Sequence, residues 1–156
     1  MNKQPVITIH PVTTEEQMQQ CWYIRAEVFI KGQAVPPEDE VDGKDDQCQH
    51  YLLLLNEQPA ATARVMFYEG KAKIQRVAVL SEFQGKGLGK SLMQFILGDI
   101  HNITLPPALA ILSAQTHALN FYEKLGFEVC SDEYLDSNIP HRDMKKTLSP
   151  QLQFSP

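Results

Sequence analysis

A glycine-rich segment, Gln84 to Ser91, joins an apolar stretch of the chain to an amphipathic one. The apolar stretch, Ile74 to Leu80, has the length and composition of a strand. From Leu88 onward, apolar residues recur at helical spacing. The glycines therefore stand at a strand-to-helix junction, where backbone amides and the helix dipole can hold a pyrophosphate. Lys86 and Lys90 can add positive charge to this candidate site.

Two other phosphate-binding patterns fit this segment poorly. A P-loop needs a glycine where the chain has Gln84, and the next apolar stretch ends in Leu112 and Ser113 instead of a metal-holding Asp. A dinucleotide-binding fingerprint needs its third glycine where the chain has Lys90. The sequence therefore argues against nucleotide hydrolysis and NAD binding. Taken alone, the segment could also be a glycine turn that binds nothing.

Strand and helix signals alternate along residues 1–148, which we expect to form one domain followed by a short tail over 149–156. Thr13 and Glu16 form a capping-box pattern that predicts the start of a first helix, and Pro36 and Pro37 close that helical region. The remaining expected elements are a helix over Thr116–Leu125 and strands over Val6–His10, Tyr51–Leu55, Ala60–Phe67, Ala108–Leu112, Phe127–Cys130 and Arg142–Leu148. These elements predict an α/β fold in which helices cover both faces of a mixed sheet.

Charge and composition argue against several functions. A net charge of -5 and the lack of a dense basic run disfavour nucleic-acid binding. No apolar stretch approaches the ~18 residues of a membrane helix and no signal-peptide pattern is present, so we expect a soluble cytoplasmic protein without a membrane partner. We also expect no bound metal, because neither the cysteines (Cys21, Cys48, Cys130) nor the histidines (His50, His141) have metal-ligand spacing.

The negative charge is concentrated in one segment. Six acids lie between Glu38 and Asp46. Such a segment is either a solvated loop or a surface that attracts a cationic amine, and the sequence leaves both interpretations open.

Two linked segments match a known family. Gln84, Gly87 and Gly89 fit the pattern Gln-x-x-Gly-x-Gly, and the segment Ala118–Phe127 follows at a compatible distance. In these segments the chain resembles the GNAT superfamily of N-acetyltransferases. It also resembles the ElaA-like branch at Arg25, Val28, Phe29, Pro36, Glu40, Asp42, Asp45, His50, Leu112 to Gln115, and Ile139 to His141.

This resemblance implies a GNAT fold and direct transfer of acetyl from acetyl-CoA to a primary amine of a small molecule or peptide. The sheet would splay beside Val77, Ala78 and Val79, whose backbone would pair with the pantetheine arm and polarise the thioester carbonyl. Tyr122 would protonate the departing thiolate. Asn120 would either contact the cofactor or face solvent. The implied pyrophosphate site consists of Gln84, Gly85, Lys86, Gly87, Leu88, Gly89 and Lys90.

The acceptor side of the reaction is less well defined. A protonated amine cannot attack a thioester, so the enzyme needs a base, a water chain or selective capture of the neutral amine. The strand Ile74–Leu80, which supplies the base in some GNAT enzymes, contains no acid. Arg25 can bind a substrate carboxylate or pair with a nearby acid. The other candidate substrate-binding residues are Glu40, Asp42, His50, Gln115 and His141.

Two residues depart from the family pattern: Gly32 stands where the ElaA-like branch often has Glu, and Gln115 stands where many GNAT enzymes have Asn. A non-catalytic acyl-CoA-binding sensor or interaction module is the main alternative, and it would not need Tyr122. A partner-binding domain that uses the acidic segment would need no cofactor. The sequence leaves the oligomeric state open, with a homodimer as one possibility.

Overall fold

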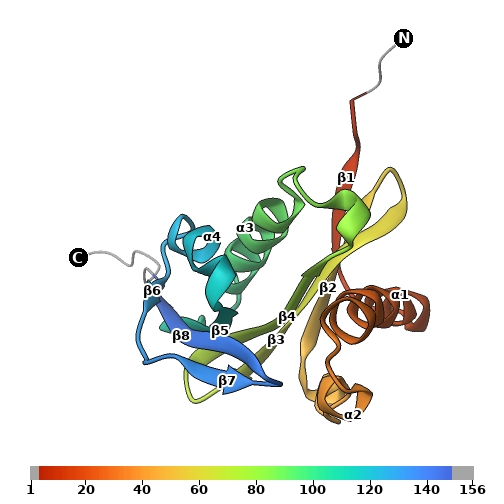
Figure 1. The fold of residues 1–156 in the computed structure, drawn as a ribbon. Helices are drawn as coiled ribbons and strands as arrows, with labels where there is room; N and C mark the ends of the chain where they lie inside the picture. The colour runs from red at the N-terminus through yellow and green to blue at the C-terminus, as the bar shows by residue number, and fades with distance from the viewer. Residues whose placement is uncertain (1–3, 149–156) are drawn as a thin grey trace.

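The computed structural model describes residues 4–148, so the tail expected over 149–156 lies outside the described residues. Eight strands form one sheet in the order β1-β2-β3-β4-β5-β8-β6, with β7 also paired to β8 (Figure 1). The pair β4–β5 is parallel, and the other described pairs are antiparallel, which confirms the predicted mixed sheet. The strands are β1 (Ile7–Pro11), β2 (Gln49–Leu55), β3 (Gln58–Tyr68), β4 (Lys71–Val79), β5 (Leu109–Gln115), β6 (Glu128–Val129), β7 (Tyr134–Asp136) and β8 (Ile139–Thr147).

Helices cover both faces of the sheet, as predicted. Figure 1 shows α3 (Leu88–His101) and α4 (Leu119–Glu123) on one face, and α1 (Glu15–Arg25) and α2 (Pro37–Glu40) on the other. Shorter turns are the π-helical η1 (Ala26–Lys31) and the 3₁₀ turns η2 (Asp45–Gln47), η3 (Ser81–Phe83) and η4 (Thr116–Ala118). None of the helices within residues 4–148 has the length and apolar character needed to cross a bilayer.

Strand β2 explains why two faces need helices. Tyr51 and Leu53 lie in the core that contains α3, whereas Leu52 lies in a second core with Cys21 and Ile24 of α1. Successive side chains of a strand point to opposite faces, so a continuous apolar run is stable only when both faces are covered.

The start of α1 differs by one residue from the prediction. Thr14, not Thr13, is the N-cap, and its side chain accepts a hydrogen bond from the backbone N–H of Gln17 at 3.1 Å. The Gln17 side chain accepts in return from the N–H of Thr14 at 3.2 Å. Gln serves as well as Glu in a capping box, so the pair one residue along competes with Thr13 and Glu16 and forms instead.

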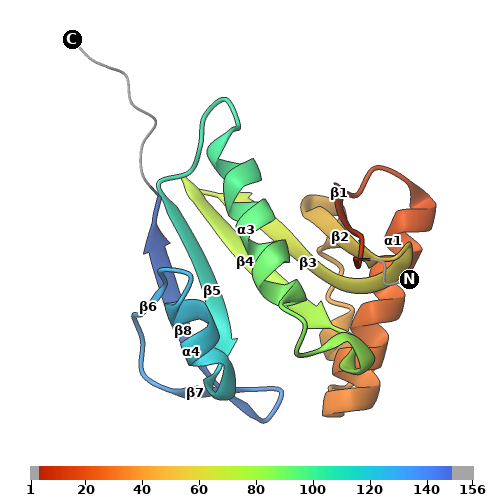
Figure 2. The same ribbon diagram turned by 90° about the horizontal axis from the view of Figure 1, so that it is seen from above.

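The sheet splits between β4 and β5. The two strands pair only from Lys71 with Leu109 to Ile74 with Leu112, and Figure 2 shows them diverging beyond that point. The same part of β4 contains a β-bulge, in which two residues, Arg76 and Val77, stand opposite the single residue Ala63 of β3. Arg76 takes a φ of 57° at this bulge. The second half of β4 therefore has one edge that no strand covers.

Candidate active site

A cavity of about 900 Å³ lies where β4 and β5 diverge. Its walls come from β4, the end of β5, η4 with α4, the segment around α2, and the turn between β7 and β8. This volume falls in the range of about 300–1,000 Å³ that is usual for small-molecule sites. Nine of the predicted site residues line the cavity: Glu40, Asp42, Val77, Ala78, Val79, Gln84, Gln115, Tyr122 and His141.

The backbone of β4 presents a donor to the split. Leu80 donates its N–H to the Ala60 carbonyl of β3 at 2.9 Å. Backbone groups alternate in direction along a strand, so the N–H of Val79 points away from β3, toward the split. The Val79 carbonyl is held by the side-chain amide of Gln84 at 3.2 Å. Gln84 thereby ties the start of the glycine segment to the end of β4.

The glycine segment begins α3 with two residues in the left-handed region. Gly85 has φ 81° and Gly87, the N-cap of α3, has φ 76°, and a Cβ on either would meet no atom within 4 Å. Gly89 is different, because a Cβ there would lie 3.3 Å from the ring of Phe121. Leu88 is a core residue, only 2% exposed. The helix start is thus open on one side and closely packed against α4 on the other.

Tyr122 projects from α4 into an aromatic cluster beside the cavity. Its ring meets Phe121 edge-on at 4.9 Å between centroids and Phe127 at 6.1 Å. Burial raises the pKa of the Tyr122 hydroxyl above its usual range. The phenol therefore stays protonated at neutral pH. Asn120, on the same helix, is exposed and does not line the cavity.

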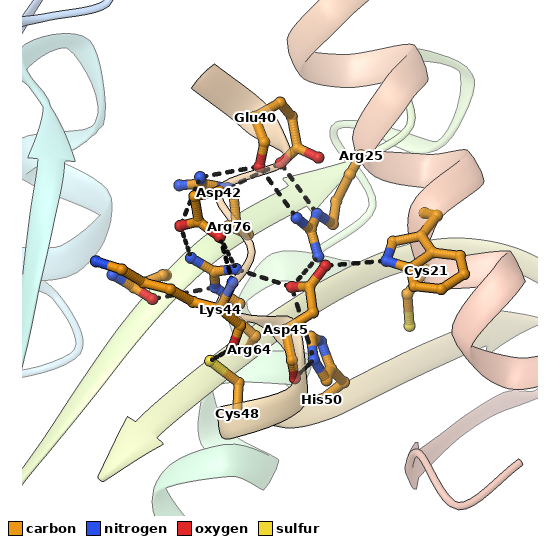
Figure 3. A network of polar contacts seen from close by, with 12 residues as sticks. Cys21, Arg25, Glu40, Asp42, Lys44, Asp45, Cys48, His50, Arg64 and Arg76 are labelled. Carbon is orange, nitrogen blue, oxygen red and sulfur yellow. Dashed lines mark hydrogen bonds and ion pairs between the residues drawn. The ribbon is translucent and has the colours of Figure 1, made fainter. Parts of the chain in front are cut away.

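Arginine residues organise the acidic segment into an ion-pair network (Figure 3). Glu40 Oε2 accepts from Arg25 at 3.0 Å and from Arg76 at 2.8 Å. Arg64 contacts Asp42 Oδ2 at 2.6 Å and Asp45 Oδ1 at 2.8 Å. Arg25 and Arg64 are 1% and 0% exposed, so these pairs lie largely inside the protein. Much of the acidic segment is therefore neutralised, in contrast to the solvated loop that was one reading of the sequence.

The network changes the acidity of its carboxyl groups. The hydrogen bond from Arg64 is the main reason that the pKa of Asp42 lies well below its usual range. Burial alone would raise the pKa of Asp45, but hydrogen bonds from Arg25 and Arg64 outweigh burial and lower it to about 2. Both acids are consequently ionised near neutral pH and held by cations.

Two predicted substrate-binding residues belong to this network and do not reach the cavity. Besides its bond to Glu40, Arg25 contacts Asp45 Oδ1 at 2.8 Å. His50 places Nε2 2.9 Å from the Asp45 backbone oxygen, and burial lowers its pKa. Neither residue lines the cavity. Arg64 of β3 and Arg76 of β4 were not among the predicted site residues. The signal that could have identified them is a charged residue within an otherwise apolar strand.

Side-chain contacts cross the opening of the cavity. Gln115, at the end of β5, donates to Gln33 Oε1 at 2.8 Å, and His117 Nε2 lies 2.6 Å from Gln115 Oε1. Ser137, between β7 and β8, donates to Asp39 Oδ2 at 3.3 Å. The Gln33–Gln115 and Asp39–Ser137 contacts join residues 33–39 to β5 and to the β7–β8 turn, where no backbone pairing spans the split.

His141 of β8 also lines the cavity, and Tyr134 of β7 stacks on its ring at 6.1 Å and 21°. The Tyr134 hydroxyl donates to Asp143 Oδ1 at 2.5 Å and also contacts the Ser113 hydroxyl. Burial, followed by the bond to Asp143, raises the pKa of Tyr134 to about 12. Within the described residues, no group of three or more His, Cys, Asp or Glu side chains is placed to hold a metal ion.

The mixed sheet that splits beside a glycine-rich helix start matches the fold of an acyl-CoA N-acyltransferase. A crystal structure of an acyl-CoA N-acyltransferase from Pseudomonas aeruginosa matches this fold with a TM-score of 0.79 and 30% identity, over 91% of this chain and 99% of that one. The protein-family model for the acetyltransferase (GNAT) domain matches residues 10–148 of the sequence. The chain belongs to the GNAT acetyltransferase family.

Relatives in sequence agree with this assignment. YjcF of Bacillus subtilis, described as an uncharacterized N-acetyltransferase, is 36% identical over 140 residues, which cover 85% of this chain and 94% of YjcF. Escherichia coli ElaA is 29% identical over 144 residues, covering 89% of this chain and 93% of ElaA. The crystal structure of ElaA matches with a TM-score of 0.78 and 26% identity, over 92% of this chain and 99% of that one. The predicted resemblance to the ElaA-like branch is confirmed.

Proposed function

We propose that the protein transfers acetyl from acetyl-CoA to a primary amine by direct attack within a ternary complex. The observation that carries this proposal is the cavity in the split of the sheet, which is lined by the free edge of β4 and by Tyr122. Membership of the GNAT family supports an acyl-CoA donor. The choice of acetyl and of a primary amine rests on the family resemblance of the motifs.

The residues at the split fit a coenzyme A donor. The N–H of Val79 faces the uncovered edge of β4, where an amide-containing arm can pair. The first turn of α3 contains no acid, and its free N–H groups favour a phosphate. Gly85 and Gly87 leave open space beside these groups, and Lys86 and Lys90 are exposed nearby.

The bound donor would supply an acyl group activated as a thioester. The Val79 N–H would then stabilise negative charge that develops on the carbonyl oxygen. Tyr122 would donate its hydroxyl proton to the departing sulfur. Its raised pKa keeps that proton in place at neutral pH, and the tyrosinate left after the transfer would readily regain a proton.

Two measurements test the proposal. Acetyl-CoA at 100 times its Kd should stabilise the fold by about 2.7 kcal/mol, seen as a rise in Tm. A panel of primary amines should then release free thiol, with the acetylated product identified by mass spectrometry. No Tm shift at millimolar acetyl-CoA would refute the donor. A Tm shift without thiol release for any amine would instead favour the non-catalytic sensor.

A further inference from the structure

The proposed reaction needs a proton acceptor for the ammonium form of the amine, and the geometry of His141 suits that role. His141 Nδ1 lies 2.6 Å from the Ile139 carbonyl oxygen. A carbonyl oxygen can only accept, so Nδ1 carries the hydrogen and the neutral ring holds its lone pair on Nε2. A short backbone contact thus selects the tautomer.

The Nε2 atom of His141 keeps some solvent exposure, and the residue lines the cavity. Nε2 makes no hydrogen bond to any residue within the range 4–148. No side-chain nitrogen or oxygen in that same range is both fully buried and without a partner. Nε2 is therefore not sealed inside the protein, although His141 as a whole is only 8% exposed and lines the cavity.

The other predicted candidates are less suitable. Glu40 and Asp42 line the cavity, but each carboxylate is shared between two arginines. Taking up a proton would weaken the largely buried ion pairs that each carboxylate makes with its arginines. His50 does not line the cavity, and its Nε2 is occupied by a backbone oxygen. His117 lines the cavity but is an exposed side chain tied to Gln115.

We propose that His141 is the general base of the acyl transfer, a role that rests on the function proposed above. Its Nε2 lone pair accepts one proton from the ammonium, while Nδ1–H stays on the Ile139 carbonyl. The neutral amine then forms the C–N bond as the C–S bond breaks. Tyr122 protonates the sulfur and regains a proton from the acylated nitrogen, and His141 returns its proton to solvent. One proton is released overall.

Tyr134 acts as a positioning residue, because its stacked ring fixes the plane of the His141 imidazole. The titratable groups that line the cavity together with His141 are Glu38, Asp39, Glu40, Asp42, Lys73, Arg76, His117, Tyr122 and Asp136.

The test is His141→Asn, because the Asn amide can keep the hydrogen bond to the Ile139 carbonyl while the acceptor nitrogen is lost. His10→Gln on β1, outside the cavity lining, is the matched control. Wild-type and variant proteins are compared by the acetyl-CoA Tm shift and by kcat/KM for the amine between about pH 6 and 10, where free alkylamines approach their own pKa of about 10.

The expected result is an unchanged Tm shift and a loss of about 100-fold or more in kcat/KM near pH 7. This loss should shrink toward pH 10, where the amine deprotonates without help, and His10→Gln should behave as wild type. A loss that is equal at all pH values would overturn the assignment, as would a His117→Gln variant that reproduces the pH-dependent loss while His141→Asn does not. Failure of the wild type to acetylate any amine would refute the proposed function instead.

Discussion

Replacing Gly87 by Asp should weaken donor binding far more than folding. Gly87 has φ 76°, and a Cβ at this position meets no atom within 4 Å. A non-glycine residue in this region costs about 1–2 kcal/mol, and Asp tolerates it better than most. A carboxylate at the start of α3 returns about 0.3–1 kcal/mol through the helix dipole. The net loss of stability is therefore about 1 kcal/mol.

The effect on donor binding is larger because the new carboxylate lies at the proposed pyrophosphate site. Two unit charges 4 Å apart repel by about 4 kcal/mol at an effective dielectric of about 20, and greater distance and salt reduce this value. A loss of roughly 1.5–3 kcal/mol, or about 10- to 100-fold in Kd, follows. Gly87→Asn is the matched control, since Asn has a similar shape and a similar tolerance of positive φ without the charge.

The assay is the Tm shift produced by acetyl-CoA at 100 times the wild-type Kd. Linkage stabilises the wild type by about 2.7 kcal/mol, which is roughly 5–10 °C for a chain of this size. The Asn variant should show nearly the same shift, whereas the Asp variant should retain only about 0.4–1.4 kcal/mol. Equal Tm shifts for the Asp variant and the wild type would show that the start of α3 is not part of the donor site. If the Asn variant lost as much of the Tm shift as the Asp variant, the cause would be the loss of the glycine backbone geometry and not the added negative charge.

Three further predictions concern catalysis and stability. Tyr122→Phe should keep the acetyl-CoA Tm shift but lower kcat by about 100-fold or more, and an unchanged kcat from pH 6 to 10 would mean that Tyr122 only packs. Arg64→Met breaks the pairs with Asp42 and Asp45 and should cost about 3–5 kcal/mol in urea unfolding, whereas Lys31→Met at an exposed pair should cost less than about 1 kcal/mol. The pKa of Asp45 is lowered to about 2 on folding, so its contribution, on the order of 2 kcal/mol, is present above about pH 4 and lost as pH falls toward 2. Urea unfolding of Asp45→Asn should lack that part of the acid dependence.

The features that could be predicted from the sequence are those with a strong local signal. The strand-to-helix junction at the glycine segment follows from glycine chemistry and apolar periodicity, and the strand over Tyr51–Leu55 follows from its apolar run. Strand β7 was missed because its residues, Tyr134–Asp136, are exposed and form a strand only through contact with β8. The cap of α1 was misplaced because Thr13 and Thr14 both fit the same pattern.

The less predictable features depend on long-range register. The bulge at Arg76 places a non-glycine residue at positive φ, and no local sequence pattern predicts this. The pairing of Arg64 with Asp42 requires β3 and the acidic segment to meet in space, although 22 residues separate them. That same register decides which acids and histidines reach the cavity. The list of acceptor-side candidates could therefore be narrowed only with coordinates.

The short parallel ladder between β4 and β5 has a bearing on the choice of acyl donor. Beyond Ile74 and Leu112 no backbone pairing spans the cavity, and its opening is crossed by the Gln33–Gln115 and Asp39–Ser137 contacts. Widening the cavity for a longer acyl chain would therefore break a few side-chain hydrogen bonds, each worth about 1 kcal/mol net, and would leave the sheet intact. In the proposed reaction, the acyl length that the cavity admits would then depend on these side chains and not on the backbone pairing of the sheet.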